Sequence, residues 1–172
     1  MIYKNKLVIN AQNERELANF LNEIGTDEQK IDFNRIEPIV SDDNMVEKME
    51  EIWGCCSNAM EVEHEEDENS ITLYFTTRGG NCESIISKLS HLCKNTSIEF
   101  IYQYASDTIA ERCGKVESYG YDDYVMVYYA DLSDFALECW CECWEEDIDM
   151  FVWNEEEKCY TFNDSEEDYD WE

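Results

Sequence analysis

Hydrophobic and polar residues alternate in several short stretches of the chain, and hydrophobic residues recur at helical spacing in others. The strand-like alternation covers residues 2–10, 58–64, 71–76, 97–105 and, more weakly, 110–117. The helical spacing covers residues 13–25, 42–54 and 81–93. Taken in order, these patterns predict a strand, two helices, two strands, a third helix and two further strands.

Local signals mark the ends of these elements. The predicted helix caps are Asn13, Asp42 or Asp43, and Asn81 at the starts, and Gly25 and Gly54 at the ends. The only proline, Pro38, lies in residues 31–40, which are predicted to form an extended link. The acidic residues 65–69 predict the exposed turn of a hairpin between the second and third strands.

The predicted order contains the β-α-β-β-α-β arrangement of a ferredoxin-like fold, one antiparallel sheet with helices on one face. This arrangement buries the apolar stripes of both amphipathic helices. We therefore predict an α+β fold with a ferredoxin-like domain over residues 1–120. Residues 121–172 are predicted to be an acidic, aromatic C-terminal extension packed on the same body, because no linker rich in Pro, Gly or Ser precedes them.

The extension is predicted to hold a helix and a hairpin. In residues 131–144 one helical face collects Leu132, Phe135, Ala136, Cys139, Trp140, Cys143 and Trp144. A strand would explain only the alternation of the cysteines in residues 139–143, so we favour the helix. Residues 150–153 and 159–162 predict a final hairpin.

Composition narrows the class of protein. At 172 residues, with 44% hydrophobic and 13% aromatic residues, the chain is predicted to be compact and globular. It has no apolar run near the roughly 20 residues that span a bilayer and no secretory signal pattern at its start, which predicts a cytoplasmic protein. The nine cysteines, an odd number, are expected to be reduced and mostly buried.

Negative charge is concentrated towards the end of the chain. Residues 116–172 hold 20 Asp or Glu and one cation, Lys158, and so contribute −19 of the formal charge of −30. Aromatic residues are spaced through the same stretch, so it is predicted to fold rather than to be disordered. The charge argues against direct binding to nucleic acid or to anionic membranes, and it favours a cationic partner.

Short motifs in the first two thirds of the chain resemble a known family. They are Asp32-Phe33-Asn34-Arg35-Ile36-Glu37-Pro38, Trp53-Gly54-Cys55 leading to Asn58-Ala59, and Phe75-Thr76-Thr77 ahead of Leu89-Ser90. On these motifs, residues 5–120 resemble the YubB ferredoxin-like family of plasmid- and phage-borne proteins. The chain departs from the family pattern at Cys55-Cys56 and at Arg78-Gly79-Gly80. The resemblance implies a ferredoxin-like fold and a mobile-element origin, and it brings no catalytic residue.

Four patterns have a chemical interpretation, and in each we favour a structural one. The C-x-C-x-C run at residues 139–143 lacks the paired C-x-x-C spacing of common zinc sites, so buried thiols are favoured. Cys82 lies near a helix start, but no neighbouring base would activate it. Residues 78–81 lack the ending of a phosphate-binding P-loop, and residues 163–170 lack the spacing of a calcium loop. We therefore predict no cofactor, no metal and no catalytic residue.

The remaining hypothesis concerns the acidic surface itself. A duplex nucleic acid carries one charge per about 1.7 Å of axis, and a groove lined with Lys and Arg accepts carboxylates at comparable spacing. Glu138, Glu142 and Glu145 or Glu146 are predicted to share one flank of the helix. The predicted partner-binding residues are Asp122, Asp123, Asp131, Asp134, Glu138, Glu142, Glu145, Glu146, Asp147 and Asp149, with Trp144 and Trp153 as anchors.

Three hypotheses of function follow. The first is a phage or mobile-element inhibitor of a bacterial defence effector, of the anti-CRISPR or anti-restriction type, which mimics DNA or RNA and occupies a basic nucleic-acid-binding groove. The second is an accessory protein-binding or structural module of a mobile element, which binds through its exposed sheet or its apolar C-terminal helix while its charge serves solubility. An enzyme is the third.

Overall fold

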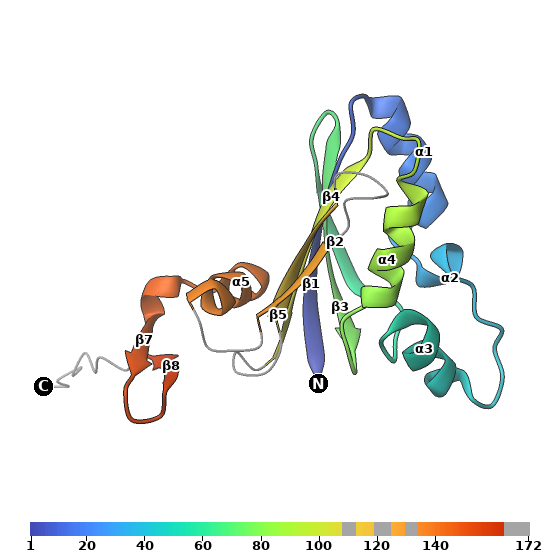
Figure 1. The fold of residues 1–172 in the computed structure, drawn as a ribbon. Helices are drawn as coiled ribbons and strands as arrows, with labels where there is room; N and C mark the ends of the chain where they lie inside the picture. The colour runs from blue at the N-terminus through green and yellow to red at the C-terminus, as the bar shows by residue number, and fades with distance from the viewer. Residues whose placement is uncertain (108–112, 119–124, 130–133, 164–172) are drawn as a thin grey trace, which may run out of the picture.

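A computed structural model describes residues 1–107, 113–118, 125–129 and 134–163 of the chain. In these residues the strands form an antiparallel sheet in the order β2-β3-β1-β4-β5-β6 and a separate hairpin, β7-β8 (Figure 1). The strands are β1 (Ile2–Asn10), β2 (Met60–Glu66), β3 (Ser70–Arg78), β4 (Glu99–Ser106), β5 (Cys113–Ser118), β6 (Val125–Tyr129), β7 (Phe151–Asn154) and β8 (Cys159–Phe162). The prediction of an α+β fold built on an antiparallel sheet is confirmed.

Helices lie on both sides of the large sheet (Figure 1). One face is covered by α1 to α4, and α5 lies against the other face, between the sheet and the β7-β8 hairpin. The helices are α1 (Glu14–Ile24), α2 (Phe33–Ile36), α3 (Met45–Trp53), α4 (Glu83–Leu92) and α5 (Asp134–Trp144), with a short 3-10 helix, η1 (Ile148–Met150), after α5. Within the described ranges, no helix has the length and apolarity that crossing a membrane requires.

The main core follows from the alternation along β1. Tyr3, Asn5, Leu7 and Ile9 are buried, while the residues between them are only partly covered. The three apolar side chains pack in one cluster with the buried faces of α1 and α4, which include Ile85. Burying each such side chain stabilises the fold by about 1.5–3 kcal/mol relative to leaving it exposed.

A second, smaller core lies on the opposite face of the sheet. It contains Ala136, Leu137, Cys139, Trp140, Cys141 and Cys143 of α5, together with Ala105 of β4 and Phe151 of β7. Leu137 and Cys141 lie outside the predicted apolar stripe of the helix. They are nevertheless buried in this cluster, because α5 is covered on one side by the sheet and on another by the hairpin.

A polar network lies inside the main core. The amide of Asn5 donates to two backbone carbonyls at 3.3 Å and to the hydroxyl of Thr77 at 3.2 Å. The hydroxyl of Tyr102 donates to Oδ1 of Asn5 at 2.6 Å, and the sulfur of Cys82 lies 3.5 Å from the same hydroxyl. Since Asn5 makes bonds through both its nitrogen and its oxygen, the cost of burying its amide is offset.

Several predicted caps agree with the structure, and two helix starts do not. Oδ1 of Asn13 accepts a hydrogen bond from the first turn of α1 at 2.9 Å, and Gly54 adopts the left-handed conformation that ends α3, with φ 82°. The helix α3 begins after Asn44 rather than after an aspartate. The helix α4 begins after Cys82, although the side chain of Asn81 still accepts from a backbone N–H two residues on, at 3.3 Å.

The sequence patterns did not predict α2, β6 or the short helix η1. Residues 31–40 are not extended throughout, because Asp32 caps the single turn of α2 by accepting a hydrogen bond from the N–H of Asn34 at 3.0 Å. The strand β6 pairs with β5 at the end of the sheet. The large sheet therefore includes strands on both sides of residue 120.

Candidate binding surface

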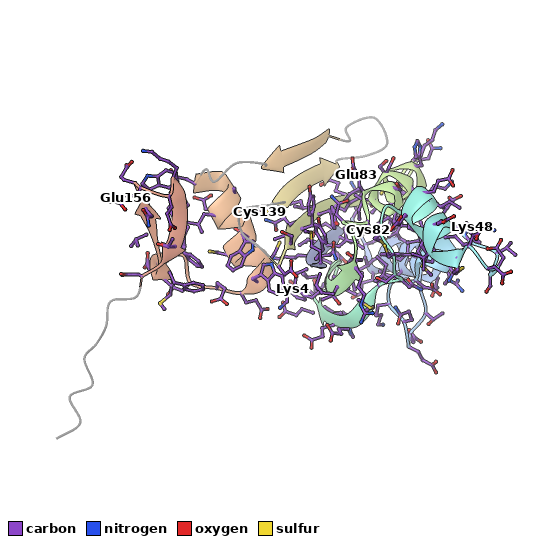
Figure 2. The ribbon with its side chains drawn as sticks, turned by 90° about the horizontal axis from the view of Figure 1, so that it is seen from below. Lys4, Lys48, Cys82, Glu83, Cys139 and Glu156 are labelled. Atoms are coloured by element: carbon purple, nitrogen blue, oxygen red, sulfur yellow. The ribbon has the colours of Figure 1, made fainter. Side chains whose placement is uncertain are left out.

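The described part of the C-terminal extension presents many exposed carboxylates. They run from α5 through η1 to the turn of the hairpin, and we refer to them as the acidic surface: Asp134, Glu138, Glu142, Glu145, Glu146, Asp147, Asp149, Glu155, Glu156 and Glu157. Lys158 is the only lysine or arginine in residues 134–163, and its ammonium group lies 2.6 Å from a carboxylate oxygen of Glu155. Figure 2 shows Glu156 at the opposite end of the molecule from Lys48.

Seven of the ten predicted partner-binding acids belong to this surface, Asp134 through Asp149. The other three, Asp122, Asp123 and Asp131, lie outside the described residues. The hairpin turn adds three carboxylates, Glu155, Glu156 and Glu157, that the sequence analysis did not select. They were missed because only the tertiary structure packs the hairpin against α5, through Phe151 and Trp140.

The predicted row of acids does not extend beyond the end of α5. Glu138 and Glu142 are exposed one turn apart, and Glu142 accepts a hydrogen bond from the amide of Gln103 in β4 at 2.5 Å. The helix ends before Glu145, whose φ of 56° turns the chain away from the helical path. The N–H of Glu146 then donates to the carbonyl oxygen five residues back at 3.0 Å, which closes the helix. The prediction that Glu145 or Glu146 continues the row is therefore wrong.

Carboxylates gather at the end of α5 that disfavours them. Glu145 and Glu146 directly follow the C-terminus of the helix, where the last carbonyl groups form the negative end of the helix dipole. The last turn of α5 contains no basic residue. Each such acid costs on the order of 0.3–1 kcal/mol at low ionic strength. Violations of a local stability rule are typical of functional surfaces.

The two predicted tryptophan anchors have different roles. The indole N–H of Trp144 donates to the carbonyl oxygen of Ser106 at 2.8 Å, and its ring stacks on that of Trp140 with centroids 6.0 Å apart. The ammonium group of Lys4 lies 5.0 Å from the centre of the Trp144 ring. Trp144 therefore fastens α5 to the sheet, whereas Trp153 of the hairpin is 41% exposed and remains accessible.

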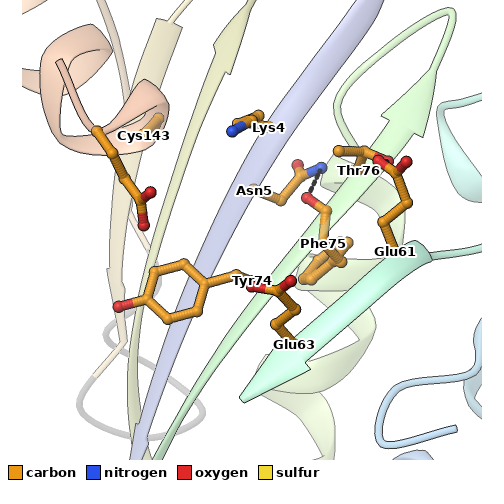
Figure 3. Close-up of a pocket in the computed structure, with 9 residues that line it drawn as sticks. Lys4, Asn5, Glu61, Glu63, Tyr74, Phe75, Thr76 and Cys143 are labelled. Atoms are coloured by element: carbon orange, nitrogen blue, oxygen red, sulfur yellow. Dashed lines mark hydrogen bonds between the residues drawn. The ribbon is translucent and has the colours of Figure 1, made fainter. Parts of the chain in front are cut away.

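A pocket of about 330 Å³ lies where the end of α5 meets the sheet (Figure 3). Its lining is Lys4, Asn5, Glu61, Glu63, Tyr74, Phe75, Thr76, Cys143 and Glu145. Burial raises the pKa of the Tyr74 phenol, and the nearby carboxylates of Glu65 and Glu145 raise it further. The phenol therefore stays protonated and donates to Glu65 at 3.4 Å. With three carboxylates and one ammonium group, the pocket extends the negative surface towards β2.

The buried cysteines do not form a reactive site. Cys82 is fully buried, and burial raises the pKa of its thiol far above the ordinary value, which contradicts an activated thiolate. Burial likewise raises the pKa of Cys55 to about 11. The thiol of Cys139 donates to a backbone carbonyl of β4 at 3.7 Å. In the part of the chain that the structure describes, no three His, Cys, Asp or Glu side chains are arranged to hold a metal ion.

The turn at residues 78–81 uses its backbone groups within the fold. The N–H of Arg78 donates to the hydroxyl of Ser57, and the N–H of Gly79 donates to the carbonyl oxygen of Met1, both at 3.0 Å. A Cβ atom on Gly80 would lie 2.3 Å from a backbone oxygen of the neighbouring turn, so a glycine is required there. These contacts favour a structural turn over a phosphate site. Residues 163–170, for which the spacing argued against a calcium loop, lie outside the described residues beyond Asn163.

Comparison with known proteins adds no relative. No protein-family model, no curated protein and no solved structure matches the chain. The resemblance to the YubB family stays a prediction from the sequence motifs.

Proposed function

We propose that this protein is an inhibitor carried by a phage or another mobile element, and that it occupies the basic nucleic-acid-binding groove of a bacterial defence effector. The effector would be a nuclease of a CRISPR or restriction system, bound in the bacterial cytoplasm without a cofactor and without turnover. One observation carries the proposal: the acidic surface presents ten exposed carboxylates over residues 134–163, with one cation that is itself paired. Carboxylates in such number take the place of phosphates in a groove of Lys and Arg.

The attachment of α5 supports a preorganised charge array. The indole N–H groups of Trp140 and Trp144 both donate to the carbonyl oxygen of Ser106, at 3.1 and 2.8 Å, and Gln103 holds Glu142. The hairpin is attached in turn, because the hydroxyl of Tyr160 donates to Asp134. Charges held in place before binding lose less conformational entropy on association, which favours tight binding.

The topology supports the proposed origin. Without the short helices α2 and α3, the first elements follow the order β1-α1-β2-β3-α4-β4, and these strands lie in the sheet order β2-β3-β1-β4. This order supports the proposal of a ferredoxin-like core, to which β5, β6, α5 and the hairpin would be additions. It agrees with the resemblance to the YubB family and hence with a mobile element. Because one fold serves many functions, it supports the origin and not the activity.

The second candidate is an accessory module that binds a protein partner through apolar contacts. The apolar side chains of α5 that the structure describes are not free for this, because they pack in one cluster with Ala105 and Phe151. The observation that favours this candidate is instead the hairpin region, where several large hydrophobic residues are exposed: Ile148, Met150, Val152, Trp153 and Phe162.

Capture of partners from a lysate of bacteria that carry CRISPR and restriction systems tests the proposal. We expect a basic nuclease that is released by moderate salt, because contacts between exposed charges are screened over about 8 Å at physiological ionic strength. Nucleic acid should then compete with this protein for the purified nuclease. A complex in which the nuclease holds both together would refute occupation of the groove, and binding that is insensitive to salt would favour the accessory module.

Two charge-reversal variants distinguish binding through the acidic surface from an effect of the net charge of the protein. The variant E138K/E146K changes the acidic surface, and E28K/E51K makes the same change in net charge at exposed positions before α2 and in α3. We expect the first to weaken binding to the nuclease at least about tenfold at low salt, and the second to weaken it far less. Equal losses would mean that the protein acts through its net charge rather than through this surface.

A further inference from the structure

The β7-β8 hairpin has one aromatic face. Phe151 pairs with Phe162 across the strands, and Trp153 pairs with Tyr160. The ring centroids are 4.6 Å apart in the first pair and 5.2 Å apart in the second. Side chains alternate along a strand, so these four rings lie on the same side of the hairpin. We refer to them as the aromatic face.

The rest of the molecule covers this face unevenly. The ring of Phe151 is buried against Trp140 of α5, edge to face with centroids 5.6 Å apart. Tyr160 is partly buried, and its hydroxyl donates to Asp134. The other two rings stay open, since Trp153 is 41% and Phe162 53% exposed. Phe151 and Tyr160 therefore pack within the fold, and Trp153 and Phe162 form the exposed half of the aromatic face.

This exposure is concentrated rather than scattered. Within the described residues, the large hydrophobic side chains that remain exposed are Met1, Val40, Val46, Ile148, Met150, Val152, Trp153 and Phe162, and five of these eight fall in residues 148–162. Single exposed apolar residues are normal on a protein surface, but a cluster of them marks an interaction site. Tryptophan is also among the residues that contribute most at interfaces.

The charge around the aromatic face indicates what binds there. Asp147 and Asp149 precede β7, and Glu155 and Glu156 form the turn that follows it, and all four carboxylates are exposed. A second copy of this chain, a nucleic acid or an anionic membrane would bring like charge against them. A cationic protein surface is the complementary occupant.

Between the two basic side chains, arginine fits better than lysine. A guanidinium group is planar, stacks on an indole ring and still donates two parallel hydrogen bonds to a carboxylate. The ammonium group of lysine is more strongly hydrated and acts as a point charge. A single residue separates Trp153 from the acidic turn that begins at Glu155. The indole ring and the carboxylates are therefore close together in the chain.

We propose that the exposed half of the aromatic face, centred on Trp153, is a docking site for arginine side chains on the basic surface of the partner. The inference rests on the proposed function and names the side chain that the partner presents. The acidic surface attracts the basic partner at long range, and the aromatic face distinguishes arginine from lysine on contact.

Nona-arginine and nona-lysine peptides test this with the full-length chain. Calorimetric titration at physiological ionic strength should give nona-arginine about two- to fivefold tighter binding than nona-lysine, the preference that an exposed cation–π contact supplies. The substitution Trp153→Leu, which keeps the charge and an apolar side chain, should abolish this preference and leave nona-lysine binding unchanged. Val152→Ala, at a similarly exposed position on the other side of the same strand, should keep the preference.

A folding control accompanies the titration. The indole N–H resonances of Trp140 and Trp144 report the attachment of α5, because both groups donate to the carbonyl oxygen of Ser106. They should not shift on Trp153→Leu, whereas the indole resonance of Trp153 in the unchanged protein should move on addition of nona-arginine.

The outcomes separate the inference from the proposed function. Equal affinity for the two peptides, or a preference that survives Trp153→Leu with α5 in place, would overturn the arginine site. It would leave the salt-sensitive binding of cations by the acidic surface intact. If neither peptide bound, both the arginine site and the acidic surface as a cation-binding surface would be refuted.

Discussion

Removal of one buried hydroxyl, by Tyr102→Phe, tests the polar network inside the main core. The side chain of Tyr102 is fully buried, and its hydroxyl donates to Oδ1 of Asn5, which is only 2% exposed, at 2.6 Å. The substitution removes a single oxygen atom and leaves the ring in place, so its effect on packing is small. It therefore reports mainly on the hydrogen bond and on the acceptor that is left behind.

The expected loss of stability follows from these two contributions. A neutral hydrogen bond contributes about 0.5–1.5 kcal/mol net, and a buried acceptor left without its donor costs about 1–3 kcal/mol. We expect Tyr102→Phe to lower the free energy of unfolding by about 2 kcal/mol. For a chain of this length that corresponds to a melting temperature lower by roughly 4–8 °C.

Urea unfolding followed by circular dichroism measures this loss, with the salt concentration held constant. Tyr74→Phe is the matched control, since its hydroxyl donates to Glu65 at 3.4 Å at a partly exposed position, and a loss below about 0.5 kcal/mol is expected there. The double variant Asn5→Leu/Tyr102→Phe should lose less than the sum of the single variants by about 1–2 kcal/mol, because the orphaned acceptor is gone. Additive losses, or equal losses for the two tyrosines, would refute the network.

Two further predictions concern a carboxylate and the thiols. Hydrogen bonds from the side chain and backbone of Ser97 lower the pKa of Glu16, so its stabilising contribution is present above the ordinary carboxyl pKa and is lost as the pH falls through the lowered value. Urea unfolding should therefore show a difference in the free energy of unfolding between the wild type and Glu16→Gln at pH 7, and this difference should shrink below about pH 4. A difference that is unchanged at pH 3 would contradict this expectation. For the thiols, iodoacetamide should alkylate Cys56 at least about tenfold faster than Cys55 or Cys82 in the native protein, because Cys56 alone of these three is partly exposed. Peptide mass spectrometry over time measures the three alkylation rates. Equal rates would contradict the burial of Cys82.

Local sequence patterns predicted much of the fold because their causes are local. The alternation of Tyr3, Leu7 and Ile9 needs only a strand with one buried face, and Asn13 caps α1 through its own neighbours. The single turn of α2 was missed although its cap, Asp32, is equally local, because the nearby proline indicated an extended chain. In the candidate site, the composition alone located the acidic stretch.

Other features of the site depend on residues far apart in the chain. Trp144 and Trp153 both lie among acidic residues, and both are predicted from the sequence to be anchors. Trp144 is instead held by Ser106, a residue 38 positions away, while Trp153 is left exposed. No periodicity within α5 indicates this difference, because it arises from the position of the helix on the sheet.

The sequence by itself determined the α+β class, most of the strands and helices, and the sign and location of the charge. These properties follow from side-chain chemistry and from backbone periodicity over a few residues. Only the tertiary structure decided that α5 covers the second face of the sheet, that Glu145 leaves the helical row, and that the hairpin packs against α5. Those outcomes depend on which distant segments bury one another, and burial is a property of the assembled fold rather than of any local stretch of chain.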